Sequence, residues 1–330
     1  MVNGEILISS KVLVTGGAGF IGSNIIEKLL KQDNFVVCLD NLATGKMSNI
    51  EAFTNNKNFR FINGDIRDIK TCEKACKGID IVLHQAALGS VPRSIKDPVT
   101  TNQVNIDGFI NMLIAARDNK VKRFVYASSS SVYGDSKELP KHENKIGNPL
   151  SPYAVTKSVN ELYAKVFGNL YGMETIGLRY FNVFGKNQDP DGAYAAVFPK
   201  FISTLIKHKA PVIFGDGTQS RDFTYIANVV QANELAATTS NPDAINTVFN
   251  IAYGKSISLN EITSELIKVL SDFDSKINEI NPVYGPLRQG DIKDSLASID
   301  KAKRLLGYMP AYNVHDGLKL AVKWYFDCLK

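Results

Sequence analysis

The sequence predicts an α/β fold built on a doubly wound parallel sheet, followed by a smaller C-terminal α/β lobe. Between residue 11 and about residue 181, short β-branched or aromatic runs alternate with longer amphipathic segments, which is the pattern of βαβ units. Beyond Gly185 this regularity gives way to loops rich in proline and glycine. We therefore expect one domain over residues 1–185, which parts of 220–254 rejoin, and a second lobe mainly over residues 186–330.

Six buried strands and five helices account for this pattern. The strands are expected at Lys11–Thr15, Phe35–Asp40, Phe59–Asp65, Ile81–Gln85, Arg123–Ser128 and Thr175–Phe181. The helices are expected at Ile21–Lys31, Ile106–Asn119, Tyr153–Tyr171, Leu259–Leu270 and Gly317–Cys328. Ser151 is a suitable N-cap for the third helix, so Tyr153 should lie in its first turn. Right-handed crossovers should put helices on both faces of the sheet.

Composition narrows the class of protein. The 330 residues are 44% hydrophobic and 22% charged, and no run approaches the roughly 20 apolar residues of a membrane helix, so no membrane span is expected. The N-terminal apolar run leads into a glycine loop and is typical of a first strand, not of a signal peptide, which favours a cytoplasmic location. The net charge of +5 is spread along the chain, which favours an anionic small ligand over nucleic acid. The four cysteines and four histidines show no metal-ligand spacing, so no metal site is predicted.

A glycine loop after the first strand predicts a dinucleotide site of the Rossmann type. Three glycines at GxxGxxG spacing join the strand to a helix, and this stretch gives the first cofactor candidates: Gly16, Gly19, Phe20, Ile21 and Gly22. Glycine permits the tight turn and a close approach to a pyrophosphate, and the helix N-terminus presents unpaired N–H groups to that anion. Asp40 ends the second strand, 18 residues past Gly22, where a carboxylate can bind the ribose hydroxyls and repel a 2'-phosphate. The expected cofactor is therefore NAD rather than NADP.

Ser129, Tyr153 and Lys157 are the candidate catalytic residues. Tyr153 and Lys157 are four apart on an expected helix, so their side chains share a face and can meet at the cofactor, which makes both cofactor-binding candidates as well. A nearby ammonium would favour the phenolate that acid/base chemistry needs, and Ser129, at the end of the fifth strand, could bridge substrate and phenol. A second pair at the same spacing, Tyr133 and Lys137, lies in a turn region, where this spacing brings nothing together.

Beyond these residues, the chain resembles the extended short-chain dehydrogenases/reductases over nearly its full length, and more narrowly the nucleotide-sugar 4-epimerases. The matching stretches are Gly16 to Gly22, Asp40-Asn41-Leu42, Gly64-Asp65-Ile66, His84-Gln85-Ala86-Ala87, Ser128 to Gly134, Tyr153 to Lys157 and Arg179-Tyr180-Phe181-Asn182. The resemblance implies further cofactor contacts at Asn41, Asp65, Ile66, Ala86 and Tyr180. It also implies that the nucleoside diphosphate of the substrate is held by Asn182, Arg221, Arg288 and Asp291.

The segment after the fifth strand indicates the type of reaction. Related dehydratases and decarboxylases usually carry an acidic residue there, whereas this chain has only serines from Ser128 to Ser131, which favours epimerisation. In the mechanism that the resemblance implies, Tyr153 takes the C4 hydroxyl proton while hydride passes to a tightly bound NAD. The resulting 4-keto sugar turns over and receives the hydride on its other face.

Two positions indicate which sugar is used. The segment around Ser90 resembles the corresponding loop of epimerases that act on UDP-N-acetylhexosamines. In the resembling epimerases, the position matching Ser295 faces the C2 substituent of the sugar, and a small residue there leaves room for an N-acetyl group. The expected substrates are UDP-N-acetylglucosamine and UDP-N-acetylgalactosamine, with a role in polysaccharide biosynthesis.

Two alternatives stay open at this point: a UDP-glucuronate 4-epimerase, and a noncatalytic dinucleotide sensor of the same fold. The resemblance further implies a homodimer built from the helices Ile106–Asn119 and Tyr153–Tyr171.

Overall fold

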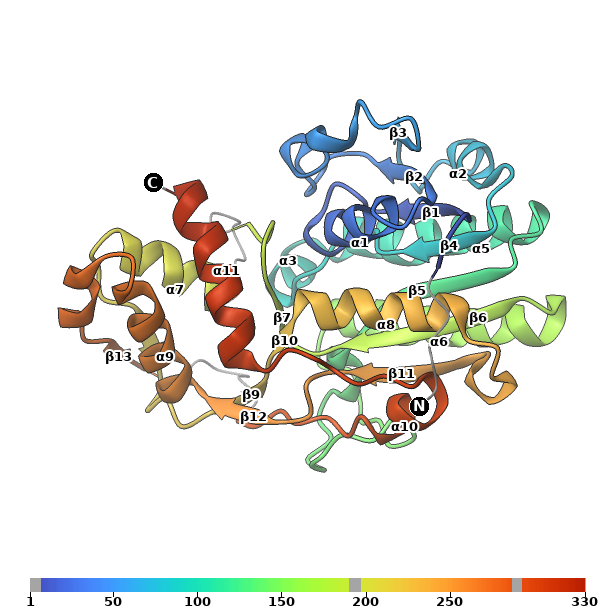
Figure 1. Ribbon diagram of the computed structural model, residues 1–330. Helices are drawn as coiled ribbons and strands as arrows, with labels where there is room; N and C mark the ends of the chain where they lie inside the picture. Colours follow the sequence, from blue (N-terminus) through green and yellow to red (C-terminus); the bar gives the residue numbers. More distant parts are fainter. Residues whose placement is uncertain (1–6, 190–196, 287–292, 330) are drawn as a thin grey trace.

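The computed structural model describes residues 7–189, 197–286 and 293–329, and its centre is a seven-stranded sheet (Figure 1). The strand order is β11-β6-β5-β4-β1-β2-β3, and every neighbouring pair is parallel. The strands are β1 (Lys11–Thr15), β2 (Phe35–Asp40), β3 (Phe59–Asn63), β4 (Ile81–His84), β5 (Arg123–Ser129), β6 (Glu174–Tyr180) and β11 (Thr247–Ile251).

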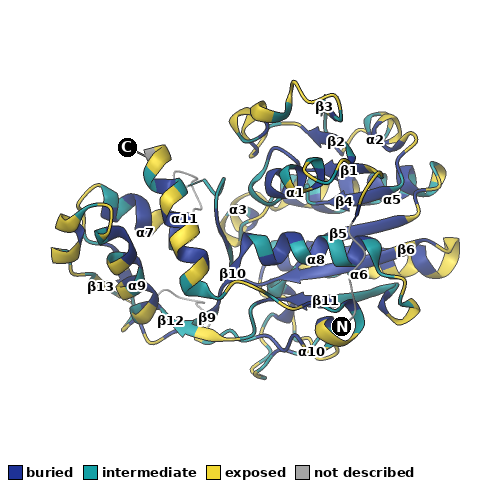
Figure 2. Cartoon of the chain, in the orientation of Figure 1, coloured by how far each residue is buried: buried dark blue, intermediate teal, exposed yellow. Residues whose placement is uncertain are grey.

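Helices cover both faces of this sheet, and the strands other than the edge strand β3 are largely buried (Figure 2). One face is covered by α1 (Phe20–Leu30) and α8 (Ile226–Thr238), and the other by α2 (Ile69–Cys76), α5 (Gly108–Asp118) and α6 (Pro152–Tyr171). Along β1, Val12 and Val14 pack into the first of these layers and Leu13 into the second. Strands that are apolar on both faces are characteristic of a parallel sheet between two helical layers. The predicted doubly wound α/β fold is confirmed.

All six predicted strands form, with ends within two residues of those expected. The seventh strand, β11, was not predicted; it lies beyond the regular βαβ pattern and pairs with β6 across a long sequence separation. The helix expected from Ile106 begins instead at Gly108, since Gln103–Asp107 form a π-helical turn that continues α4 (Pro98–Asn102).

The C-terminal part contains α7 (Val197–Ile206), α9 (Leu259–Ser271) and α11 (Val314–Leu329), so both helices predicted there are present. Three small sheets accompany them, namely β7 (Val183–Phe184) with β10 (Thr224–Tyr225), β9 (Ser220–Asp222) with β12 (Ser256–Ser258), and β8 (Val212–Phe214) with β13 (Val283–Gly285). The last segment also contributes α10 (Asp300–Leu306), which packs on β11. Because segments after residue 185 return to the large sheet, the division into two domains near that residue stays a prediction. Within the described residues, no helix has both the length and the apolar character needed to cross a membrane.

Candidate active site

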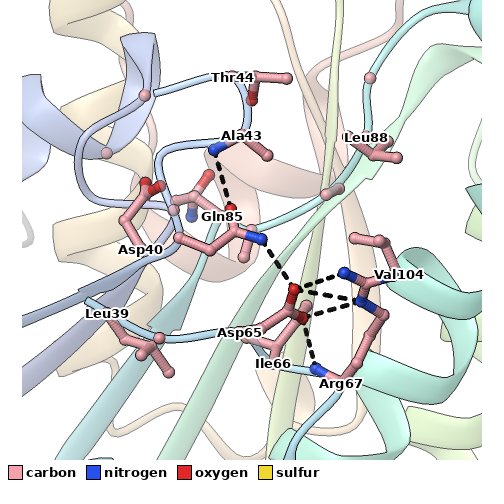
Figure 3. A pocket seen from close by; sticks show the side chains of 18 of the residues that line it. Leu39, Asp40, Ala43, Thr44, Asp65, Ile66, Arg67, Gln85, Leu88 and Val104 are labelled. Carbon is pink, nitrogen blue, oxygen red and sulfur yellow. Dashed lines mark hydrogen bonds and ion pairs between the residues drawn. The ribbon is translucent and has the colours of Figure 1, made fainter. Parts of the chain in front are cut away.

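The carboxyl ends of the parallel strands open onto a cavity of about 350 Å³ (Figure 3). Its size lies within the roughly 300–1,000 Å³ that is usual for small-molecule sites. Ten of the predicted cofactor residues line it, and these are Gly16, Gly19, Phe20, Ile21, Gly22, Asp40, Asn41, Asp65, Ile66 and Ala86. The structure thus brings together residues from the ends of four strands.

The glycine loop has a shape that only glycine can adopt. Gly16 has a φ of +66°, and a Cβ there would lie 2.7 Å from the backbone nitrogen of Ala86. A Cβ on Gly22 would lie 2.2 Å from the carbonyl oxygen of Gly16, so this glycine lets α1 pack closely on the loop. Gly19 is the N-cap of α1 and has no side chain to satisfy the first-turn N–H groups. These groups line a cavity and suit the pyrophosphate of a dinucleotide.

Asp40 lies at the rim of the same cavity with its carboxylate held in place. The N–H of Ala18 donates to Oδ2 (2.9 Å) and the N–H of Leu42 donates to Oδ1 (2.8 Å). Burial raises the pKa of this carboxyl, and the two backbone bonds oppose that rise. A carboxylate oxygen can accept a second hydrogen bond, so both oxygens remain available to ribose hydroxyls.

Asp65 forms a second fixed carboxylate on the far wall (Figure 3). Arg67 donates to it from Nη2 (2.7 Å) and Nε (3.0 Å), and Asn41 Nδ2 donates at 2.9 Å. The Arg67 bond is the main reason that the pKa of Asp65 falls to about 2. Asp65 therefore presents a permanent charge beside the cavity.

Ser129, Tyr153 and Lys157 meet where β5 ends and α6 begins. Ser151 caps α6 by accepting from the N–H of Ala154 (3.2 Å), which puts Tyr153 in the first turn as predicted. The Tyr153 hydroxyl is hydrogen-bonded to Ser129. Lys157 Nζ donates to the carbonyl of Ala127 (2.8 Å) and lies 6.0 Å from the centroid of the Tyr153 ring. All three predicted residues are thus close together, although Tyr153 and Lys157 do not line the 350 Å³ cavity.

The two titratable groups of this trio are tuned in opposite directions. Burial raises the pKa of Tyr153, and the hydrogen bond from Ser129 partly opposes that effect. Burial lowers the pKa of Lys157 to about 8, and the charge of Glu161 opposes that fall. Burial thus favours the neutral form of both groups and moves their pKa values apart, so a positive charge beside Tyr153 is what would favour its phenolate.

The alternative pair, Tyr133 and Lys137, does not form a site. Tyr133 is 2% exposed, and its hydroxyl donates to Asn250 Oδ1 (2.6 Å) and accepts from Arg179 Nη1 (3.0 Å). Burial raises the pKa of Tyr133 to about 12. Lys137 is exposed. The hydroxyl of Tyr133 thus serves the structure, because its two partners are Asn250 and Arg179.

A second cavity has a volume of about 180 Å³, and the residues that follow Ser129 in the chain form part of its wall. Three of the predicted substrate residues, Asn182, Arg221 and Ser295, also line it. It is lined by Ser130, Ser131, Tyr133, Gly134, Lys141, Phe181, Asn182, Arg221, Asp294 and Ser295. Arg221 Nη1 donates to the carbonyls of Ser220 (2.9 Å) and Lys293 (3.0 Å).

Of three further predicted substrate residues, the structure describes only Ser90. Ser90 lines neither cavity; it is the N-cap of α3 (Val91–Lys96), with a φ of 124°, and its Oγ accepts from the N–H of Arg93. Arg288 and Asp291 lie outside the described residues.

Sequence reasoning missed several residues of both cavities. Arg67 lines the first cavity, and its place two residues after Asp65 was the available signal. Gln85 also lines this cavity; it accepts a hydrogen bond from the Tyr180 hydroxyl (3.1 Å) and donates one to Asn233 (3.1 Å). Tyr180, a predicted cofactor residue, does not line the cavity itself but contacts Gln85, which does. Lys141 lines the second cavity and has no motif that marks it.

No cluster of three or more His, Cys, Asp or Glu groups that could hold a metal ion occurs in the part of the chain described.

The chain is similar to several known proteins over nearly its whole length. It is 41% identical to the structure of a UDP-N-acetylglucosamine 4-epimerase from Methanobrevibacter ruminantium M1 in complex with UDP-N-acetylmuramic acid, with a TM-score of 0.91 and coverage of 98% of this chain and 100% of that one. A Methanocaldococcus jannaschii protein with a provisional UDP-glucose 4-epimerase name is 41% identical, covering 95% of this chain and 97% of the relative.

A third similar protein has a structure with both ligands bound. It is a UDP-glucuronic acid 4-epimerase from Bacillus cereus in complex with UDP-glucuronic acid and NAD. It is 34% identical, with a TM-score of 0.86 and coverage of 96% of this chain and 99% of that one.

The model of the NAD dependent epimerase/dehydratase family matches residues 12–252, which include both the glycine loop and the Ser129–Tyr153–Lys157 group. The glycines and the carboxylate of the 350 Å³ cavity also fit a dinucleotide. The chain therefore belongs to the NAD dependent epimerase/dehydratase family, and its cofactor is NAD.

Proposed function

We propose that this protein interconverts UDP-N-acetylglucosamine and UDP-N-acetylgalactosamine by inverting C4. The observation that carries the proposal is Ser295, a small residue that lines the same 180 Å³ cavity as Asn182 and Arg221. The structural similarity to a UDP-N-acetylglucosamine 4-epimerase supports it. Arg221 suits a diphosphate because its guanidinium can bind two phosphate oxygens.

Ser129 at the end of β5, with Tyr153 and Lys157 on α6, supplies the acid/base chemistry of this proposal. Bound NAD supplies the acceptor and donor of the C4 hydride. Tyr153 takes the proton of the C4 hydroxyl, directly or through Ser129, and later returns it. The ammonium of Lys157, 6.0 Å from the Tyr153 ring, favours the phenolate form. The sugar must turn over as the 4-keto species between the two hydride transfers, so the sugar cavity needs room.

The second candidate function is C4 inversion of UDP-glucuronate. The similarity to the Bacillus cereus enzyme favours it, as does the serine-rich wall formed by Ser130 and Ser131. Lys141 lines the same cavity and offers a cation to a carboxylate. We rank this function second because the match to the acetylhexosamine enzyme has the higher identity.

A direct assay separates these candidates. We expect the NAD-bound protein to convert UDP-N-acetylglucosamine into UDP-N-acetylgalactosamine, with a kcat/KM above those for UDP-glucose and UDP-glucuronate. Chromatography of the nucleotide sugars after incubation measures each conversion. Preferential turnover of UDP-glucuronate would replace the first proposal by the second, and no turnover of any UDP-sugar by NAD-bound protein would favour a noncatalytic sensor.

We further propose a homodimer formed through α6. Val155, Leu162, Val166 and Leu170 form an apolar stripe along this helix, and Leu162 and Leu170 are 64% and 69% exposed. On the adjoining α3 and α4, Ile95 and Val99 are also exposed. The sequence analysis had placed α5 in this interface, but the described side chains of α5 include no large exposed apolar group. The large exposed apolar side chains therefore favour α6 with α3 and α4, and the part expected for α5 stays a prediction.

Light scattering should find a dimer at micromolar concentration, and Leu162→Glu should produce a monomer because it puts a charge into an apolar interface. Leu320→Glu is the matched control, since Leu320 is a 49% exposed leucine on α11. The control should remain dimeric. A monomeric wild type that is active would remove the dimer proposal.

A further inference from the structure

A buried ion pair lies one helical turn beyond Lys157. Tyr153, Lys157 and Glu161 are spaced by four residues on α6, so they form one stripe on the helix. Arg179, on β6, donates to the Glu161 carboxylate from Nε (2.9 Å) and Nη2 (2.7 Å). The side chains of Arg179 and Glu161 are 3% and 12% exposed. A planar guanidinium bound in this two-point manner is held in one orientation.

The same carboxylate also holds the end of β5. Ser128 Oγ donates to Glu161 Oε1 (2.5 Å), and Ser128 precedes Ser129 in the chain. Ser128 and Arg179 are register partners in the β5–β6 pair. Glu161 therefore bonds to two neighbouring strands at their carboxyl ends, where the proposed reaction takes place.

Glu161 lies one helical turn from Lys157 on the same stripe of α6 and carries a negative charge there. Beside Lys157 lie Tyr153 on α6 and His84 on β4, and His84 is neutral because burial lowers its pKa to about 3. Glu161 is the group whose charge opposes the burial-driven fall in the pKa of Lys157. The ion pair itself is faced by Tyr126 on β5, Tyr133 after β5, Glu143 in the loop before α6 and Lys301 on α10.

We propose that Glu161 is a positioning residue of the reaction centre: bound by Arg179 and Ser128, its carboxylate keeps the Lys157 ammonium charged beside Tyr153 and fixes the strand end that carries Ser129. The proposal rests on the proposed roles of Tyr153 and Lys157. Glu161 touches neither substrate nor cofactor in it and acts through Lys157 and Ser128 alone.

The test separates charge from shape. Glu161→Gln keeps an oxygen for Ser128 and Arg179 but removes the charge, so Lys157 should lose its proton at a lower pH. We expect the alkaline limb of the kcat profile to move down by about one pH unit, which is about a tenfold loss of kcat on that limb. Glu161→Asp keeps the charge and should keep the limb near its wild-type position.

A matched control lies at the other end of the same two strands. Arg123 on β5 donates to Glu174 on β6 from Nη2 (2.6 Å) and Nε (2.9 Å), far from the carboxyl ends of the sheet. Glu174→Gln removes a comparable ion pair and should leave the pH profile unchanged. Unlike Glu161, Glu174 is 48% exposed, so this control also loses less stability.

A second measurement needs no turnover. The ultraviolet difference titration of tyrosine in the NAD-bound protein, corrected with Tyr153→Phe, reports the ionisation of Tyr153. In Glu161→Gln this ionisation should move to higher pH, because the ammonium that favours the phenolate is lost earlier. The titration remains decisive even if no UDP-sugar is turned over, so failure of the proposed function is told apart from failure of this proposal.

Removing one partner of a buried ion pair can prevent folding, because it leaves an uncompensated charge. If Glu161→Gln does not fold, the double variant Glu161→Gln/Arg179→Gln is neutral and should show the same displacement of the alkaline limb and of the Tyr153 titration. Wild-type behaviour in both measurements, or an equal displacement in Glu174→Gln, would overturn the proposal.

Discussion

Replacing Tyr153 by phenylalanine is expected to lower kcat by about 10²-fold or more, the usual scale for a positioned acid/base group. The fold should survive, because the hydroxyl bonds to Ser129 at the edge of the protein core and the ring is kept. Bound NAD should also remain, since Tyr153 does not line the 350 Å³ cavity. The measurements are kcat, the NAD released on denaturation, and the thermal unfolding midpoint.

Tyr133→Phe is the matched control and should show the opposite pattern. Its hydroxyl is buried and bonds to Asn250 and Arg179, so its removal leaves two polar groups with one partner fewer. The cost of such an unsatisfied buried group is about 1–3 kcal/mol of the free energy of unfolding. The unfolding midpoint should therefore fall while kcat changes far less than in Tyr153→Phe. Equal losses of kcat in the two variants would mean that Tyr153 is not the acid/base residue.

Features encoded in short stretches of sequence were predicted well. The glycine loop was found because Gly16 and Gly22 occupy positions that a Cβ would block, a constraint visible in the local motif. The position of Tyr153 followed from Ser151, whose capping bond fixes the start of α6. The six strands followed from apolar runs that match a sheet buried on both faces.

Features that depend on long-range contacts were not predicted. Lys141 lines the second cavity, and its backbone N–H donates a hydrogen bond to the carbonyl of Leu296, which is far away in the sequence. The ion pair of Glu161 and Arg179 joins a helix to a strand, and the helical spacing alone does not reveal the partner. The strand β11 is recognised only once its pairing with β6 is known. Such residues carry no local periodicity, because tertiary packing alone brings them together.

The second large effect is expected at Ser295, a small residue in the wall of the second cavity. Ser295 is half-buried in the cavity wall, and its N–H donates to the carbonyl of Ser220 (3.1 Å). The following helix, α10, begins at Asp300 with Ile299 as its N-cap, so Ser295 does not cap a helix. A small side chain in this cavity wall is consistent with a role in admitting a bulky C2 substituent.

We expect Ser295→Tyr to lower kcat/KM for UDP-N-acetylglucosamine and UDP-N-acetylgalactosamine by about 10²-fold or more, because a phenol ring added to a cavity of about 180 Å³ competes with the acetamido group for space. UDP-glucose and UDP-galactose carry only a hydroxyl at C2 and should be affected much less. The 4-keto sugar must also turn within this space, so the loss should appear in kcat as well as in KM.

Ser295→Ala is the control that separates volume from hydrogen bonding. It keeps the space and removes the hydroxyl, so the preference for acetylated substrates should persist. A general loss of stability in Ser295→Tyr would lower kcat/KM for acetylated and plain sugars alike, whereas steric exclusion changes their ratio. The deciding quantity is therefore that ratio in wild type, Ser295→Ala and Ser295→Tyr. If it is the same in all three, Ser295 does not select the sugar, and the UDP-glucuronate function becomes the better explanation of the site.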